Sequence, residues 1–179
     1  TGKLDFDENK GLTCSFWYRK DDRVSGNKID GTILSLLDEK GNKGIKFLSI
    51  WGVPNLYMNN GKINYKRVGD NVWRHWGVVV SPLAASDNVG NRDWNVSLYI
   101  NGELINSFKN NGVLGKQFIF GALGGSGAAN GYFDELRIFN KTLDEKEMQL
   151  LSIRHQAMIP KRLAASGGHH DAGDYNPRS

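Results

Sequence analysis

Aromatic side chains near strand ends and in loops are the first residues of this sequence that could bind a ligand. The chain has 179 residues, five of them tryptophan, and aromatic faces stack on sugar rings. Trp17 and Trp76 lie inside apolar strand patterns, where core packing is the stronger interpretation. Core packing also remains the alternative for the residues that we expect to form a carbohydrate-binding surface: Trp51, Tyr57, Tyr65, Trp73 and Trp94.

A glycine-rich segment near the C-terminus carries a second set of candidates. Residues 166–176 read Ser-Gly-Gly-His-His-Asp-Ala-Gly-Asp-Tyr-Asn. Histidines beside carboxylates can bind a divalent metal ion weakly, and such a segment can equally be a linker without fixed structure. In the order of its residues, the segment resembles the catalytic-base motif of glycoside hydrolase family nine, the inverting cellulase-type enzymes with an (α/α)₆ barrel.

The resemblance implies roles for the two aspartates of this segment. Asp174 would be the general base, and Asp171 would help to position the attacking water. An inverting glycosidase also needs a carboxylic acid across the substrate, and in this family that glutamate lies far downstream. Because it is absent here, we expect this chain alone to be inactive, whereas its parent would be a glycoside hydrolase.

The rest of the chain reads as short strands separated by turn residues. Leu12–Arg19 alternates with the period of a strand, and Trp73–Val80 is the most apolar strand and is expected to lie centrally. Asn59–Gly61 and Asn101–Gly102 predict hairpin turns, because Asn and Gly tolerate positive φ. Further strands are expected at 32–37, 45–51, 54–58, 63–67, 96–100, 104–108, 118–121 and 132–140.

These roughly ten strands at regular spacing indicate an all-β fold, an antiparallel two-sheet sandwich. One short C-terminal helix is expected after the strands. Asp144 and Glu147 have the spacing of a capping box, and a helix starting there would run to about residue 153 with Met148 and Leu151 facing inward.

Several segments together resemble the laminin-G-like, concanavalin A-like jelly-roll domains. The resemblance covers about Leu4 to Leu151 and predicts a jelly-roll domain over 1–155, followed at 156–179 by a linker and the start of a hydrolase catalytic domain. In order along the chain, the segments that carry it are 12–18, 73–80, 96–103, 120–121 and 131–140, the last reading Gly-Tyr-Phe-Asp-Glu-Leu-Arg-Ile-Phe-Asn.

In this family, an aspartate at the position of Asp134 often helps to ligate a structural calcium ion with groups near the N-terminus. The resemblance therefore implies Ca²⁺ held by Asp134, with Asp5 and Asp7 as co-ligands. Strict alternation breaks at Asp134–Glu135, which predicts a bulge or a turn into the strand. The alternative is that Asp134 only accepts hydrogen bonds from backbone donors at that bulge.

Composition excludes several other classes. The net charge is +4 with scattered basic residues, unlike the basic stripe of a nucleic-acid-binding protein. No apolar run reaches about 18 residues, so no transmembrane helix is expected. Cys14 is the single cysteine, which excludes an intrachain disulfide and a cysteine-based zinc site. The start at Thr1–Gly2, without Met or a signal peptide, suggests a chain cut from a longer protein.

The sequence thus predicts an accessory module, carbohydrate-binding or structural, of a polysaccharide-degrading hydrolase. Its expected partners are a β-glucan-type polysaccharide and the adjoining catalytic barrel, with no nucleic acid and no membrane. Polysaccharide chemistry suggests an extracellular or periplasmic location. The alternatives are a free-standing jelly roll that contacts glycan or protein, and a structural spacer.

Overall fold

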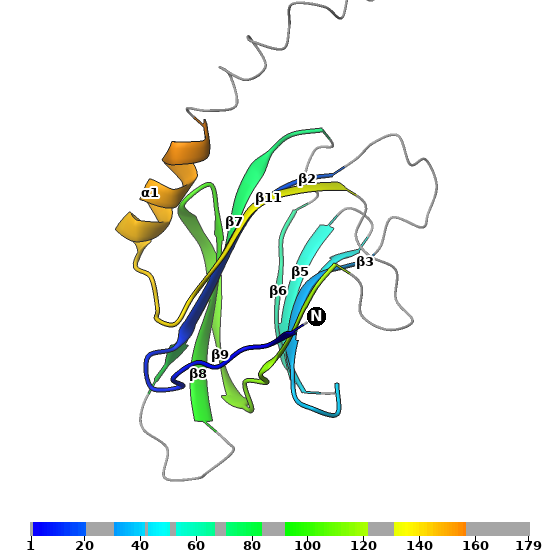
Figure 1. The fold of residues 1–179 in the computed structure, drawn as a ribbon, viewed down its shortest axis with the longest axis vertical. Helices are drawn as coiled ribbons and strands as arrows, with labels where there is room; N and C mark the ends of the chain where they lie inside the picture. Colours follow the sequence, from blue (N-terminus) through cyan, green and yellow to red (C-terminus); the bar gives the residue numbers. More distant parts are fainter. Residues whose placement is uncertain are drawn as a thin grey trace, which may run out of the picture.

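Two antiparallel sheets face each other in the computed structural model, which describes residues 2–20, 31–41, 43–50, 53–66, 71–83, 92–121 and 131–156 (Figure 1). The six-stranded sheet has the order β1-β10-β3-β4-β5-β6 and the five-stranded sheet the order β11-β2-β7-β8-β9. The bounds are β1 Gly2–Lys3, β2 Leu12–Lys20, β3 Gly31–Leu37, β4 Gly44–Ile50, β5 Val53–Met58, β6 Gly61–Asn64, β7 Arg74–Pro82, β8 Arg92–Ile100, β9 Glu103–Gly112, β10 Gln117–Phe120 and β11 Gly131–Phe139.

The predicted all-β sandwich is confirmed, and so are its two hairpin turns. Asn59 and Asn101 have φ of 48° and 53°, and Gly102 has φ of 84°, which is the left-handed region that such turns require. The strand expected at 73–80 occupies the middle of the five-stranded sheet as β7. The largest boundary errors are of four residues: β8 starts that much earlier than the expected strand at 96–100, and β9 ends that much later than the one at 104–108.

The core fills the space between the two sheets. On β2 the even-numbered residues from Leu12 to Tyr18 point inward, because successive side chains of a strand alternate between its faces and these four belong to the main buried cluster. Phe16 packs against Phe47 and Phe120 of the opposite sheet, with ring centroids 6.1 and 5.7 Å away. Cys14 is a small residue of this core, and its burial raises the pKa of the thiol to about 12.

The single helix of the described residues, α1 (Glu145–Gln156), covers part of the outer face of the five-stranded sheet (Figure 1). Met148 is fully buried there in a second cluster with Val79, Tyr99 and Leu143. Gly77 lies directly beneath it, since a Cβ built on Gly77 would lie 2.0 Å from the Met148 Cε. The helix therefore covers this part of the sheet and packs on it through apolar contacts.

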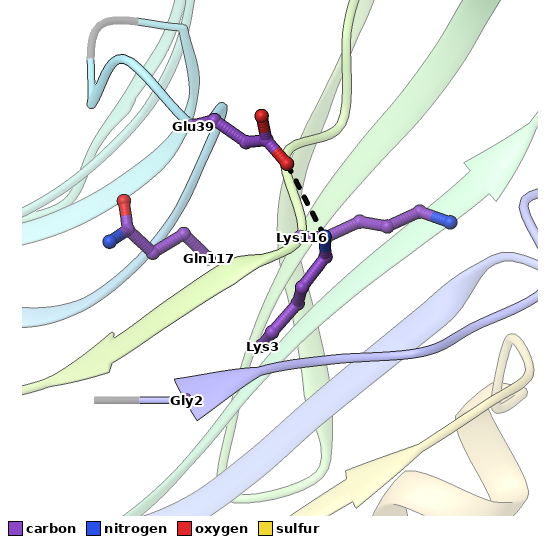
Figure 2. A pocket seen from close by; sticks show the side chains of 5 residues that line it. All are labelled: Gly2, Lys3, Glu39, Lys116 and Gln117. Atoms are coloured by element: carbon purple, nitrogen blue, oxygen red, sulfur yellow. Dashed lines mark hydrogen bonds and ion pairs between the residues drawn. The ribbon is translucent and has the colours of Figure 1, made fainter.

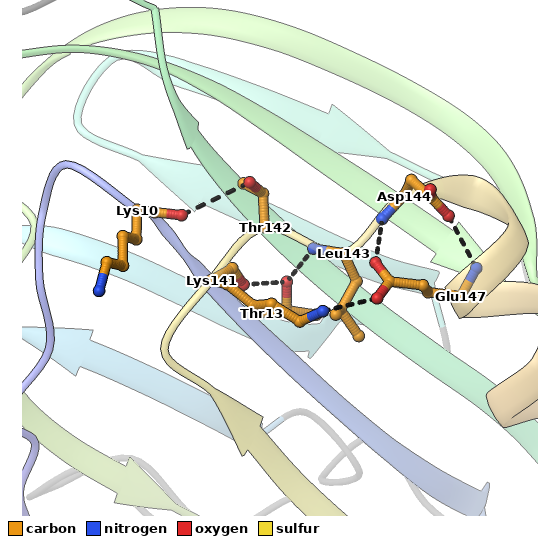
Figure 3. A network of polar contacts seen from close by, with 7 residues as sticks. All are labelled: Lys10, Thr13, Lys141, Thr142, Leu143, Asp144 and Glu147. Atoms are coloured by element: carbon orange, nitrogen blue, oxygen red, sulfur yellow. Dashed lines mark hydrogen bonds and ion pairs between the residues drawn. The ribbon is translucent and has the colours of Figure 1, made fainter.

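A chain of hydrogen bonds holds the segment that leads into α1 (Figure 3). The buried Thr13 hydroxyl donates to the Lys141 carbonyl at 2.9 Å and accepts from the Leu143 N–H at 3.0 Å. The predicted capping box is confirmed: the Glu147 N–H donates to Asp144 at 2.8 Å, and the Asp144 N–H donates to Glu147 at 3.0 Å. The N-terminus of the helix is thus fixed to the start of β2.

The Glu147 carboxylate of this capping box also binds Lys141, at 2.6 Å. The hydrogen bond from Lys141, together with the one from the Asp144 backbone, lowers the pKa of Glu147.

The edge strands of both sheets are short or irregular. β1 has two residues and β6 four. β11 carries an extra residue between Asp134 and Arg137, where Glu135 has φ of 51°, and this is the predicted bulge. β9 carries an extra residue, Ile105, opposite the Leu98–Tyr99 step.

Candidate functional site

The five aromatic residues expected on a carbohydrate-binding surface do not form one surface. Trp94 is fully buried in the main core cluster, and its indole N–H donates to the Gly112 carbonyl at 3.0 Å. The prediction for Trp94 is therefore wrong, because β8 extends to Arg92 and places Trp94 on the same inward face as Val96 and Leu98. Trp51 lies outside the described residues.

The two tyrosines belong to the six-stranded sheet and its border. Tyr57 on β5 is half-buried and points away from the core, opposite to its neighbours Leu56 and Met58. The Lys62 ammonium lies 5.7 Å from its ring centroid. Tyr65 follows β6 and packs against the main core cluster. Tyr57 consequently offers part of a ring to solvent, whereas Tyr65 serves mainly in packing.

Trp73 belongs to a row of three side chains across the five-stranded sheet, which we call the aromatic row: Tyr132, Arg19 and Trp73. The register pairs Tyr132 of β11 with Arg19 of β2, and the pairing of Tyr18 with Arg74 places Trp73 beside Arg19. The Arg19 guanidinium carbon lies 4.5 Å from the Tyr132 ring centroid and 5.4 Å from that of Trp73. The row is accessible, since 37% of Tyr132 is exposed and the other two are half-buried.

The sequence analysis missed Arg19 and Tyr132. Arg19 alternates with the inward-facing Tyr18, so its outward position could be read from the strand pattern. Its two aromatic neighbours, however, lie more than fifty residues away along the chain, on the segments that pair with the two sides of β2. A single sequence does not reveal that register.

The neighbouring outward residues on the same face, Trp17 and His75, are buried. Trp17 and His75 are each 1% exposed, with ring centroids 5.4 Å apart. The Ser15 hydroxyl and the His75 Nε2 are hydrogen-bonded at 2.7 Å. His75 is therefore a packing residue hydrogen-bonded through Nε2, and the packing interpretation of Trp17 is confirmed, although on the outer side of the sheet. Near the end of β2, the accessible part of this face is therefore the aromatic row and its surroundings.

The structure does not assemble the predicted calcium ligands. The Asp7 N–H donates to Asn140, just beyond the end of β11, at 2.8 Å. Asp134 precedes Asn140 by six residues of extended chain, a span of roughly 20 Å, and its carboxylate accepts from the Glu135 N–H at 2.9 Å. No three His, Cys, Asp or Glu residues of the described ranges are placed to hold a metal ion. Asp134 thus caps a backbone donor at its bulge, apart from Asp7, and a calcium ion held by Asp134, Asp5 and Asp7 stays a prediction.

A surface pocket lies at the opposite sheet, near β1 and β10 (Figure 2). An ion pair of 3.3 Å joins Lys3 to Glu39 there, and both side chains are largely exposed. Gly2, Lys116 and Gln117 also line it. Among the described residues, neither an expected site residue nor an aromatic side chain lines this pocket, so it offers less to a sugar ring than the aromatic row.

The two aspartates of the hydrolase-like segment, Asp171 and Asp174, lie outside the described residues, so their roles stay predictions. Within the described residues, no helix combines the length and apolarity needed to cross a membrane.

Comparisons with solved structures support the sandwich architecture. The binding domain of Paraclostridial Mosquitocidal Protein 1 is 22% identical, with a TM-score of 0.61 over 86% of this chain and 40% of that one. The binding domain of botulinum neurotoxin serotype D is 18% identical, with a TM-score of 0.60 over 85% of this chain and 39% of that one. This chain thus spans about two fifths of each, and at these identities the likeness shows the fold alone.

Sequence comparison defines the family. No curated protein sequence matches the chain. A family model does match, over residues 1–149, and it describes the concanavalin A-like lectin/glucanases superfamily in its Laminin_G_3 branch. With most of its length covered by that model and two antiparallel sheets as its architecture, this chain belongs to the concanavalin A-like lectin/glucanases superfamily.

Proposed function

We propose that this chain is a non-catalytic carbohydrate-binding module that uses the aromatic row of Tyr132, Arg19 and Trp73. The observation that carries the proposal is the placement of two accessible aromatic rings on one rigid sheet face, on either side of a polar group. Sugar rings are recognised by stacking on aromatic faces and by a few polar groups that fix orientation. Because Tyr132 and Arg19 lie on paired strands and Trp73 directly precedes β7, binding requires little ordering of side chains.

The experiment that tests this site is affinity electrophoresis of the whole chain in gels containing soluble β-glucans. The wild type is expected to be retarded, and Trp73→Ala or Tyr132→Ala is expected to lose most of the retardation. Tyr57→Ala is the matched control, since it removes a half-buried aromatic ring from the outer face of the other sheet. If Tyr132→Ala is still retarded in the glucan gel and Tyr57→Ala is not, the binding site lies on the six-stranded sheet instead.

We further propose that the module belongs to an inverting glycoside hydrolase of the family-nine type and acts on extracellular or periplasmic polysaccharide. The supporting observation is the order of residues 166–176, which carries Asp171 and Asp174. Sequencing the native gene past Ser179 tests this directly. A continuation with helical-hairpin periodicity and a late catalytic glutamate is expected. A stop codon directly after Ser179 would exclude hydrolysis and leave a binding or structural jelly roll.

A further inference from the structure

The guanidinium group of Arg19 carries a positive charge on this face of the molecule that no described residue neutralises. It forms no hydrogen bond or ion pair with any residue in the described ranges, and its Nε atom is buried. An arginine carries five N–H donors in a fixed planar fork, and a buried donor without a partner, such as the Nε–H here, is costly. The neighbours of Arg19 are the two aromatic rings, and the guanidinium carbon lies 4.5 Å from the Tyr132 ring centroid and 5.4 Å from that of Trp73.

The two rings limit the orientations of this charge. With Tyr132 on one side and Trp73 on the other, the guanidinium has less freedom to reorient than an isolated surface arginine. Asp134 lies in the next row of the same face, paired with Trp17, and no ion pair joins it to Arg19. The arrangement therefore presents a pre-oriented cation that the described carboxylates leave unneutralised.

We propose that Arg19 binds the carboxylate of an acidic sugar, so that the polysaccharide bound at the aromatic row contains uronic acid residues. This inference rests on the proposed function and specifies its ligand class. The planar fork of an arginine matches the two oxygens of a carboxylate in a bidentate pair. The sugar ring would stack on the accessible aromatic ring beside the guanidinium, so that the carboxylate and the ring of one monosaccharide are recognised together.

A matched pair of ligands tests the proposal. β-1,4-Glucan oligomers and the same oligomers oxidised to carboxylates at C6 share one backbone and differ only in charge. In isothermal titration calorimetry with the whole chain, the oxidised oligomer is expected to bind at least about tenfold more tightly than the neutral one, because charge-assisted hydrogen bonds are the stronger kind. That preference is expected to shrink as salt increases, since salt screens accessible charges.

The decisive variant is Arg19→Met, which keeps an unbranched apolar side chain but removes the fork. It is expected to abolish the preference for the oxidised oligomer, and Arg19→Lys is expected to restore only part of it. Lys109→Met is the control: Lys109 is an exposed cation on the same face near the opposite end of the sheet, where it pairs with Asn95. This variant lowers the net charge equally and is expected to keep the preference.

The outcomes separate the two proposals. If both oligomers bind equally and Tyr132→Ala weakens both, the carbohydrate-binding function stands and the acidic ligand is wrong. Equal losses in Arg19→Met and Lys109→Met would also overturn the assignment, because they would reflect net charge alone. If neither oligomer binds, the proposed function fails, and this inference fails with it.

Discussion

The outer face of the five-stranded sheet has two halves that are built from the same strands. Toward the start of β2, α1 covers the sheet and buries Met148 against Val79 and Tyr99. Toward the end of β2, the outward residues are charged and aromatic, and Arg19 lies between Trp73 and Tyr132. One half is closed by apolar packing, and the other remains accessible.

The difference shows how one sheet can combine a structural and a recognition surface. Strand alternation supplies an outward side chain at every second residue in both halves. Small and apolar residues, such as Gly77 and Val79, allow the helix to dock. Further along the strands, larger aromatic and cationic residues stack on one another instead. We expect the covered half to determine stability and the accessible half to determine binding.

The largest effect is expected for Met148→Ala in the covered half. Removing this fully buried side chain should lower the free energy of unfolding by about 2–5 kcal/mol. Urea unfolding followed by tryptophan fluorescence measures the change. Leu150→Ala on the same helix is the control, because Leu150 is 59% exposed and its removal should cost less than about 0.5 kcal/mol. Similar losses for both variants would contradict the docking of the helix described here.

Thr13→Val tests how the helix is fixed to the sheet. Valine has nearly the same shape but cannot satisfy the Lys141 carbonyl and the Leu143 N–H. Leaving these groups without a partner should cost about 1–3 kcal/mol, measured by the same unfolding assay. Thr13→Ser keeps the hydroxyl and should recover most of that loss. An unchanged stability in Thr13→Val would mean that other groups fix this segment.

Tyr132→Ala tests the accessible half, where a smaller effect on stability is expected. Tyr132 is 37% exposed and lies on an edge strand, and an accessible cation–π contact contributes about 0.5–1 kcal/mol. The free energy of unfolding should therefore fall by no more than about 1 kcal/mol. A loss as large as that of Met148→Ala would show that the two halves do not divide stability and binding.

The smallest effect concerns pH. Hydrogen bonds from Lys141 and from the Asp144 backbone lower the pKa of Glu147 in the folded protein. A depressed carboxyl pKa stabilises the fold above the ordinary value of about 4.3 and ceases to do so as the pH falls through the folded-state pKa. An NMR titration of the Glu147 carboxyl should show this pKa, and Lys141→Met should raise it toward the ordinary value. Identical titration curves would rule out the Lys141 contact as its cause.

The fold was predictable because its local patterns agree with one another. The alternation from Leu12 to Arg19, the Asn101–Gly102 turn and the Asp144–Glu147 capping box each depend on residues close in sequence, and each is confirmed. The bulge at Asp134–Glu135 was also visible as a break in alternation. Trp94 was misplaced even though it continues the alternation of Val96 and Leu98, because the start of β8 was set too late.

The candidate site was less predictable because it depends on strand register. Arg19, Tyr132 and Trp73 meet only when β11 and β7 pair on either side of β2. Likewise, the resemblance implied a shared ion for Asp134 and Asp7, but Asp134 lies within β11 whereas Asp7 contacts Asn140 beyond its end. Distances between segments far apart in sequence follow from topology, which a single sequence does not contain.

The irregular sheet borders have a consequence for self-association. An open, regular edge strand is a template for pairing with another chain and for aggregation. Here two of the borders, β1 and β6, are too short to guide an incoming strand, and the extra residues in β9 and β11 interrupt the hydrogen-bonding pattern of the other two. For copies of this domain at high local concentration, such as those gathered along one polymer chain, these borders therefore offer few regular edges for strand pairing.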